Sequence, residues 1–571
     1  MTMSKRTLIL AFIALGSLAA LLPGTIALAA PKARPAEDLG ALAKKIEAVM
    51  SRVYKPDEPG AAVIVRKDGK TIFRKGYGLA DLELGVPVAP DMIFRLGSIT
   101  KQFTAVSVLI LAQEGKLGLR DEITKFLPDY PTQGRKITVE HLLTHTSGIQ
   151  SYTDMSEWLP LWRKDMTVKE LVDLFKDKPM QFEPGASWAY NNSGYVLLGA
   201  IIEKASGRTY ADFVQERIFK PLGLKGSSYD DTERVVPRRV RGYQKGDGGF
   251  VNAPYLSMSQ PSAAGSLMST VDDLAVWSDA VFSGRLVRKE WLDRAFTPFV
   301  LANGESSGYG YGWFVGDFAG HRSIEHGGGI NGFATYELTL PEDRVFVAIL
   351  TNSAVEGRDP GPRAVEIAWL ALGLAEPERK AVPVAAGDLD AIAGVYANES
   401  RQEYWFSREG AKLFAQRQGG EKNELYPASP TEFFLADNPA RFDFVKDAAG
   451  RVTGLRVRSR IGPVQVFAKT GKPLPSPRRE VDIDPKLYDR LVGDYELAPN
   501  FLISIIRRGD KLISQATGQS EVEIFPESEL RFFLKVVDAQ VDFTVDALGR
   551  VTGLVLHQGG RDLPARKIKK P

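Results

Sequence analysis

Residues 98–114 read SITKQFTAVSVLILAQE, a stretch whose later turns are apolar on nearly every face. A helix that is apolar all round is buried, so we expect this helix to lie at the centre of its domain. Its first turn holds Ser98 and Lys101, the only Ser-x-x-Lys pair in the chain. Three residues make nearly one helical turn, so the hydroxyl and the ammonium should lie on one face.

Strands are expected at both ends of the surrounding domain, with helices and loops between them. This order indicates an α+β architecture with an antiparallel sheet. The expected elements are a helix over 41–53, a hairpin with strands over 61–65 and 71–73, strands over 309–315, 323–326, 333–340 and 345–350, and a closing helix over 364–372.

Length and composition exclude several classes of protein. A chain of 571 residues is too long for one compact domain. Lys and Arg number 73 against 70 Asp and Glu, and the resulting net charge of +3 argues against a nucleic-acid surface. The absence of cysteine rules out disulfides, thiolate metal sites and a cysteine nucleophile. The sequence indicates no metal and no cofactor.

The N-terminal segment has the layout of a secretory signal peptide. Lys5 and Arg6 precede an apolar run over 8–22, and Ala27 and Ala29 form a small-residue cleavage site. We expect residues 1–29 to be removed and the mature protein to be periplasmic or secreted from a bacterium, without a membrane contact. An uncleaved membrane anchor is the alternative.

The last third of the chain is an internal duplication with an offset of 99 residues. Gly394 matches Gly493, and residues 442–455 share ten of fourteen positions with residues 541–554, with no slip in register. Each copy shows short alternating segments without an amphipathic helix, which predicts a small antiparallel β-barrel of lipocalin-like type. Pro-rich linkers suggest three domains, over 37–375, 386–470 and 485–569.

Two further motifs follow the Ser-x-x-Lys pair in order. Tyr190-Asn191-Asn192 begins 92 residues after Ser98, and His326-Gly327-Gly328-Gly329 ends an expected strand. This order resembles the penicillin-binding protein and class C β-lactamase superfamily of serine hydrolases. Residues 142–148 (LLTHTSG) and 264–275 resemble the same superfamily, so the likeness covers about residues 40–370.

The resemblance implies roles for the first two motifs. Ser98 would be the nucleophile and Lys101 its proton acceptor or electrostatic activator. Tyr190 would be the general base and later the acid, with its pKa lowered by the positive charge of Lys101. Asn192 would orient Lys101 and bind the substrate amide. On the motif alone, Ser98 could instead be a helix cap and Lys101 a solvated side chain.

The resemblance also implies roles for the third motif. The backbone N–H groups of Ser98 and Gly329 would form the oxyanion hole, and Gly327 and Gly328 would let the substrate backbone lie against the strand. His326 stands where relatives commonly carry Lys, so its contact with a substrate carboxylate should be weak. His326 could alternatively be a strand-end residue without a substrate contact.

Together these features lead us to expect an exported serine hydrolase that cleaves amide bonds of small peptides containing D-amino acids. The two barrels resemble the D-aminopeptidase layout, in which they restrict access to the site. They could equally serve stability or oligomerisation, and the oligomeric state stays open. The alternatives are a broad-specificity esterase, a weak β-lactamase or D-Ala-D-Ala carboxypeptidase, and a non-catalytic protein whose barrels hold an apolar ligand.

Two competing motifs are interpreted as structural. Residues 304–308 (GESSG) match the Gly-x-Ser-x-Gly pattern of other hydrolases, but no helix is expected after them, so they should form a loop. His141 and His145 have the one-turn spacing of zinc ligands, but no glutamate lies between them and no third ligand is indicated.

Overall fold

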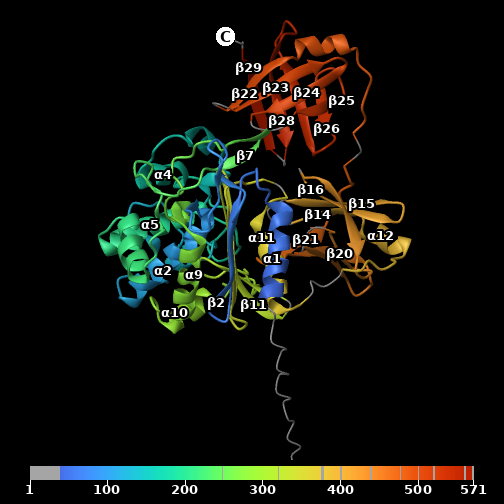
Figure 1. Ribbon diagram of the computed structural model, residues 1–571. Coiled ribbons are helices and arrows are strands. Elements are labelled where there is room, and N and C mark those ends of the chain that lie inside the picture. Colours follow the sequence, from blue (N-terminus) through green and yellow to red (C-terminus); the bar gives the residue numbers. More distant parts are fainter. Residues whose placement is uncertain are drawn as a thin grey trace, which may run out of the picture.

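The structure is a computed structural model that describes residues 39–568 except 247, 319, 356, 375–378, 399–401, 419, 437–439, 476–477, 499–500, 518–520 and 559–560. The expected signal segment and its cleavage site lie outside the described residues. Figure 1 shows an α+β domain in blue to yellow, a first barrel in orange and a second barrel in red. The expected architecture, an α+β domain with an antiparallel sheet followed by two antiparallel barrels, is confirmed.

The α+β domain is built on a six-stranded antiparallel sheet in the order β10-β11-β12-β13-β1-β2. Strand β1 therefore pairs with β13, nearly 300 residues later, which joins the two ends of the domain. The expected strands over 333–340 and 345–350 are confirmed. The strands are β1 Ala61–Lys67, β2 Lys70–Tyr77, β10 Phe314–Phe318, β11 His321–Ile330, β12 Phe333–Leu340 and β13 Val345–Thr351.

Helices cover both faces of this sheet (Figure 1). On one face α1 and α11 pack on the odd-numbered residues of β1, and on the other face lie α2, α5 and α9. In the described part of the chain, no helix has the length and apolar character to cross a membrane. The helices are α1 Leu39–Val53, α2 Thr100–Gln113, α3 Val139–Leu143, α4 Val168–Phe175, α5 Asn192–Ser206, α6 Tyr210–Val214, α7 Lys220–Leu222, α8 Ser262–Gly265, α9 Val271–Phe282, α10 Lys289–Ala295 and α11 Pro360–Leu372.

Helix α2 is the buried centre of the domain, as its sequence predicts. Every residue from Thr100 to Ala112 is buried, polar ones included. The buried polar groups have partners: Gln102, for example, accepts a hydrogen bond from the Trp277 indole at 2.9 Å. Such pairing is what allows polar side chains to remain inside a core.

Short strands hold the start of α2 in place. A three-stranded sheet in the order β5-β9-β6 lies beside it, and Leu96 donates a backbone hydrogen bond to Leu267 at 2.9 Å. A 3₁₀ turn over Gly97–Ile99 then leads into α2. The short strands are β3 Leu79–Asp81, β4 Val86–Pro87, β5 Phe94–Arg95, β6 Ser228–Tyr229, β7 Tyr243–Gly246, β8 Gly249–Asn252 and β9 Leu267–Ser269.

The first barrel is a closed ring of eight antiparallel strands. Its interior is filled by buried side chains, among them Tyr396, Phe406, Phe433 and Leu455, as is usual for a barrel of this size. The strands are β14 Gly394–Ala397, β15 Glu403–Glu409, β16 Lys412–Arg417, β17 Lys422–Pro427, β18 Glu432–Phe434, β19 Arg441–Lys446, β20 Val452–Arg458 and β21 Gln465–Lys469, preceded by the helix α12 Ala386–Ile392.

The second barrel repeats this closed ring and its packed interior. The duplication extends to single contacts: the Tyr396 hydroxyl donates to the Ile392 carbonyl, and the Tyr495 hydroxyl donates to the Leu491 carbonyl. The strands are β22 Gly493–Ala498, β23 Phe501–Arg508, β24 Lys511–Ala516, β25 Val522–Pro526, β26 Arg531–Leu534, β27 Ala539–Val545, β28 Val551–Gln558 and β29 Arg561–Ile568.

Three details of the sequence analysis are wrong. The strand expected over 309–315 begins only at Phe314, because Gly310 and Gly312 bend the preceding chain against Ala295 and α2. Each barrel is preceded by a short helix, α12 in the first copy and a 3₁₀ helix over Pro485–Arg490 in the second. The register of the duplication also slips: Lys469 and Lys567, which differ by 98, bind equivalent carbonyls, those of Ala391 and Arg490.

Candidate active site

Ser98 and Lys101 come together at the start of α2. Ser98 lies in the 3₁₀ turn over Gly97–Ile99, and Lys101 lies in the first turn of the helix. The Lys101 Nζ atom is 3.0 Å from the Ser98 Oγ atom. The two groups therefore share one face of the helix, as the spacing predicts.

The Lys101 amine has three neighbours within hydrogen-bond distance. Besides Ser98, it donates to the Asn192 Oδ1 atom at 2.8 Å and to the Ala264 carbonyl at 2.9 Å. The side chain is fully buried, and this burial holds the pKa of Lys101 well below its usual value. A neutral amine donates two hydrogen bonds and keeps one lone pair, so Asn192 and Ala264 leave that lone pair to the Ser98 hydroxyl.

Asn192 is fixed by the start of α5. The preceding residue, Asn191, caps the helix by accepting a hydrogen bond from the Gly194 N–H at 2.8 Å. The Asn192 Nδ2 atom donates to the Thr153 hydroxyl at 3.0 Å, which leaves its Oδ1 atom facing Lys101. The cap at Asn191 thus places Asn192 opposite Lys101.

Tyr190 lies beside Lys101, but its acidity is not what the sequence analysis expects. The Lys101 Nζ atom is 4.7 Å from the centre of the Tyr190 ring, and the phenol oxygen is buried without a hydrogen-bond partner among the described residues. Burial raises the pKa of Tyr190 well above its ordinary value, and the nearby Ser98 hydroxyl opposes this only in part. The expected fall in pKa is therefore wrong, because burial disfavours the phenolate and also lowers the pKa of Lys101.

His326 is a neutral residue of β11. Its side chain is buried, and burial together with the charge of Lys101 lowers the pKa of His326 to about 3. Its Nε2 atom is 3.0 Å from the Tyr309 hydroxyl, and its Nδ1 atom is 2.5 Å from the Gly327 carbonyl. At neutral pH this position supplies no cation for a substrate carboxylate.

The glycines after His326 bring β11 against the nucleophile. A side chain on Gly328 would place its Cβ atom 2.0 Å from the Leu96 carbonyl oxygen, so only glycine fits there. Gly97, with φ of +54°, also lies close to β11, since a Cβ atom on it would be 2.9 Å from the Gly329 nitrogen. Gly329 itself faces open space. The backbones that carry the two expected oxyanion donors are therefore adjacent.

Two residues around the site are not predicted by sequence. The Tyr309 hydroxyl binds His326, and the His145 ring lies 4.4 Å from the Tyr190 ring and 4.6 Å from the Tyr309 ring. His145 accepts a hydrogen bond from the Asn191 N–H at 3.1 Å, and His141 instead caps α3, so the structure does not bring the two histidines together as metal ligands. The one sequence signal that could have indicated His145 is the LLTHTSG segment, which contains it and resembles the superfamily.

A pocket of about 260 Å³ opens at Ser98. This volume lies below the usual range for small-molecule sites, so the pocket suits a small group. No charged side chain lines it among the described residues. Its lining consists of backbone at Gly97, Gly265 and Gly329, the polar residues Ser98, Thr153, Asn192 and Asn331, and the apolar or aromatic residues Tyr152, Trp158, Trp162, Leu256, Pro261, Ala264 and Ile330.

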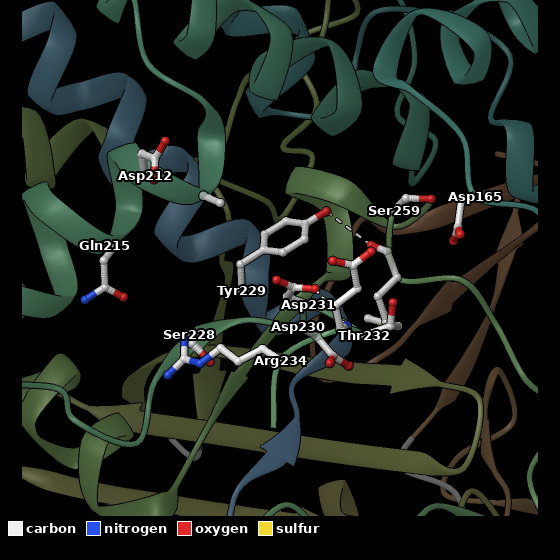
Figure 2. Close-up of a pocket in the computed structure, with 13 residues that line it drawn as sticks. Asp165, Asp212, Gln215, Ser228, Tyr229, Asp230, Asp231, Thr232, Arg234 and Ser259 are labelled. Atoms are coloured by element: carbon white, nitrogen blue, oxygen red, sulfur yellow. Dashed lines mark hydrogen bonds between the residues drawn. The ribbon is translucent and has the colours of Figure 1, made fainter. Parts of the chain in front are cut away.

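A second, open pocket of about 530 Å³ is strongly acidic (Figure 2). Asp165, Asp212 and Asp231 line it, and so does Asp230, which is buried and paired with Arg95 and Arg239. None of the expected site residues lines this pocket. The chemistry suggested by the sequence therefore gathers at Ser98 and not here.

Comparison with protein families matches most of the α+β domain to a single family. Residues 42–371 match the model of the Beta-lactamase family, which is more than half of the chain. Residues 477–567, which include nearly all of the second barrel, match a domain of unknown function (DUF3471).

Individual relatives support the same assignment. Penicillin-binding protein 4* of Bacillus subtilis (strain 168) is 28% identical over 546 residues, which cover 92% of this chain and 99% of the relative. The octameric penicillin-binding protein homologue from Pyrococcus abyssi is 27% identical, with a TM-score of 0.54, and covers 76% of this chain and 100% of its own. The D-amino acid amidase from Ochrobactrum anthropi SV3, in complex with L-phenylalanine amide, is 27% identical, with a TM-score of 0.51, over 59% of this chain and 98% of its own.

Proposed function

The chain belongs to the beta-lactamase family of serine hydrolases, and from that premise we propose that it is an exported enzyme that cleaves amide bonds of small peptides containing D-amino acids. The reaction passes through an acyl-enzyme on Ser98. The observation that carries this proposal is the buried amine of Lys101, 3.0 Å from the Ser98 Oγ atom.

In the first step Ser98 attacks the substrate carbonyl carbon and loses its proton to Lys101. The lowered pKa makes Lys101 a better proton acceptor than an exposed lysine, and the hydrogen bonds to Asn192 and Ala264 leave the lone pair of the neutral amine for Ser98. The backbone N–H groups of Ser98 and Gly329 stabilise the negative charge that forms on the carbonyl oxygen.

In the second step the C–N bond breaks and the leaving nitrogen takes a proton from Tyr190. The raised pKa of Tyr190 keeps its phenol protonated, so it begins as an acid and not as a base. The proton held by Lys101 then returns to the phenolate. Water hydrolyses the acyl-enzyme by the reverse sequence of proton transfers and frees Ser98.

The pocket supports a short and uncharged acyl group. Its apolar and aromatic lining favours an apolar side chain, and its volume of about 260 Å³ suits a short acyl group. Neutral His326 gives no cation to a free substrate carboxylate, which argues against a β-lactamase or a carboxypeptidase. The similarity to a D-amino acid amidase supports the amide and the D-configuration.

An esterase with the same acyl pocket is the second candidate, because nothing in the lining distinguishes an ester from an amide. The non-catalytic alternative loses its ligand site, since buried side chains fill both barrels. Export is proposed from the N-terminal segment alone. The mass of the protein recovered from the periplasm or medium tests it, since cleavage after Ala29 removes 29 residues.

The function is tested by intact-mass spectrometry with a serine-directed phosphonate, together with turnover of D- and L-phenylalanine amides and of p-nitrophenyl esters. One adduct should form, on Ser98, and the D-amide should be hydrolysed faster than the L-amide. Ser98→Ala should lose both activities, and Ser306→Ala, in the competing GESSG loop, should keep both. Turnover of esters alone would favour the esterase, and labelling of Ser98→Ala would overturn the proposal.

A further inference from the structure

The two barrels differ at one connection. In the first barrel β20 ends at Arg458 and β21 begins at Gln465, so the strands are joined by residues 459–464. In the second barrel β28 ends at Gln558 and β29 begins at Arg561, so only residues 559–560 lie between them. The one-residue slip of the duplication falls in the same region. We name residues 459–464 the docking loop.

The docking loop lies against the catalytic domain. A Cβ atom on Gly316, in β10, would be 2.9 Å from the Arg460 carbonyl oxygen, and one on Gly308 would be 2.6 Å from the Gly462 carbonyl carbon. At both places the two backbones touch without room for a side chain. The first barrel is therefore in close contact with the β10 edge of the six-stranded sheet, where β11 is the next strand.

Arg460 enters this edge and binds Glu325 of β11. The Nη1 and Nη2 atoms donate to the two carboxylate oxygens at 2.5 and 2.6 Å, and Nη2 also donates to the Tyr336 hydroxyl at 2.9 Å. The Ser323 and Tyr336 hydroxyls donate to the same carboxylate at 2.8 and 2.5 Å. The Glu325 side chain is fully buried and that of Arg460 is 17% exposed. A bidentate pair of this kind fixes orientation as well as charge.

Glu325 is the last residue of β11 that pairs with β10. The pairing of β10 with β11 ends at Phe314 and Glu325, whereas β11 continues to pair with β12 as far as Ile330. His326 follows Glu325 directly, and Gly329 faces the pocket at Ser98. The segment 326–330 is thus held by a strand on one side only, and Arg460 binds the last residue before it.

We propose that Arg460 is a positioning residue of the active site, through which the first barrel holds β11 so that Gly329 and His326 face Ser98. Without Arg460, a buried carboxylate would lose its charged partner and would draw β11 toward water. The role in turnover rests on the proposed function of Ser98. The role of Arg460 in holding β11 is independent of that function and is measured separately.

The test compares Arg460→Ala and Arg460→Lys with Arg458→Ala in the full-length protein. Arg458, two residues earlier, binds Asp443 within the barrel and is half-exposed, so it is a matched control. Amide hydrogen exchange of the peptide covering 326–330 is read by mass spectrometry and needs no activity. Exchange should be at least tenfold faster in Arg460→Ala, intermediate in Arg460→Lys and unchanged in Arg458→Ala. Unchanged exchange in a folded Arg460→Ala protein would overturn the proposal.

Turnover gives the second measurement. Because the oxyanion donors act in the transition state, Arg460→Ala should lower kcat at least tenfold with little change in KM. Guanidinium at millimolar concentration should restore part of kcat to Arg460→Ala and none to Ser98→Ala. Equal losses of kcat in Arg460→Ala and Arg458→Ala would refute the proposal. A wild-type protein without turnover would refute the proposed function alone, since hydrogen exchange still decides the role of Arg460.

Discussion

Glu337 makes the stability of the catalytic domain depend on pH. It lies on β12 opposite His326, is buried, and accepts a hydrogen bond from Gln102. Burial raises the pKa of Glu337 from 4.5 to about 7. A raised pKa in the folded state means that folding favours the protonated acid, so its contribution to stability is complete below pH 4.5 and is lost as the pH rises to about 7.

The size of this loss follows from the shift. Each pH unit between the two values is worth about 1.4 kcal/mol, so the contribution of Glu337 to the unfolding free energy should fall by about 3 kcal/mol between pH 4.5 and pH 8. In Glu337→Gln the side chain keeps an oxygen for Gln102 but cannot ionise. The difference in stability between the two proteins should therefore change by about 3 kcal/mol over this range.

The assay is urea unfolding at a series of pH values, followed by tryptophan fluorescence. Seven of the eight tryptophans lie in the catalytic domain and only Trp405 lies in a barrel, so the fluorescence reports mainly on the relevant domain. The control is Glu342→Gln, because Glu342 lies on the turn between β12 and β13. Glu325→Gln is unsuitable because Arg460 would lose its charged partner. Parallel pH curves for wild type and Glu337→Gln would refute the reasoning.

Further predictions concern the catalytic groups and the barrels. Lys101→Met should lower the rate of Ser98 labelling about 10²- to 10⁴-fold, measured by time-resolved mass spectrometry against Lys116→Met as control. If neutral Lys101 is the base, kcat/KM should fall as the pH falls through a pKa well below 10.5, and Tyr190→Phe should slow turnover without removing this limb of the profile. A chain ending at residue 472 should keep kcat, because Arg460 is retained, and a chain ending at residue 374 should lose it; equal activity of the two chains would contradict this.

Much of the catalytic fold can be predicted from local pattern. The strands of 333–340 and 345–350 and the hairpin at 61–73 follow from β-branched and apolar runs with turn residues between them. The strand expected over 309–315 fails because its alternation of Gly and Tyr also suits a bent chain, and only the contacts of Gly310 and Gly312 with α2 and Ala295 decide between the two. Such contacts come from distant parts of the chain.

In the site, too, the residues can be predicted from local motifs, whereas their acidity depends on contacts with distant parts of the chain. Ser98, Lys101, Tyr190, Asn192 and His326 lie in recognisable motifs, and the structure brings all of them together. Their acidity could not be read from the motifs, because it depends on burial by the whole domain. His145 and Tyr309 could not be predicted for a related reason, since their ring contacts and their hydrogen bonds to Asn191 and His326 join parts of the chain that are distant in sequence.

The docking loop also means that the two copies of the duplication have become specialised. At the offset of 99 residues Arg460 aligns with Gly559, and at the offset of 98 that holds after the slip it aligns with Gln558, so the second copy has no arginine at this place. If the sequence of the second copy were written into the first at this loop, the Arg460–Glu325 pair would be lost, so the two repeats are not interchangeable there.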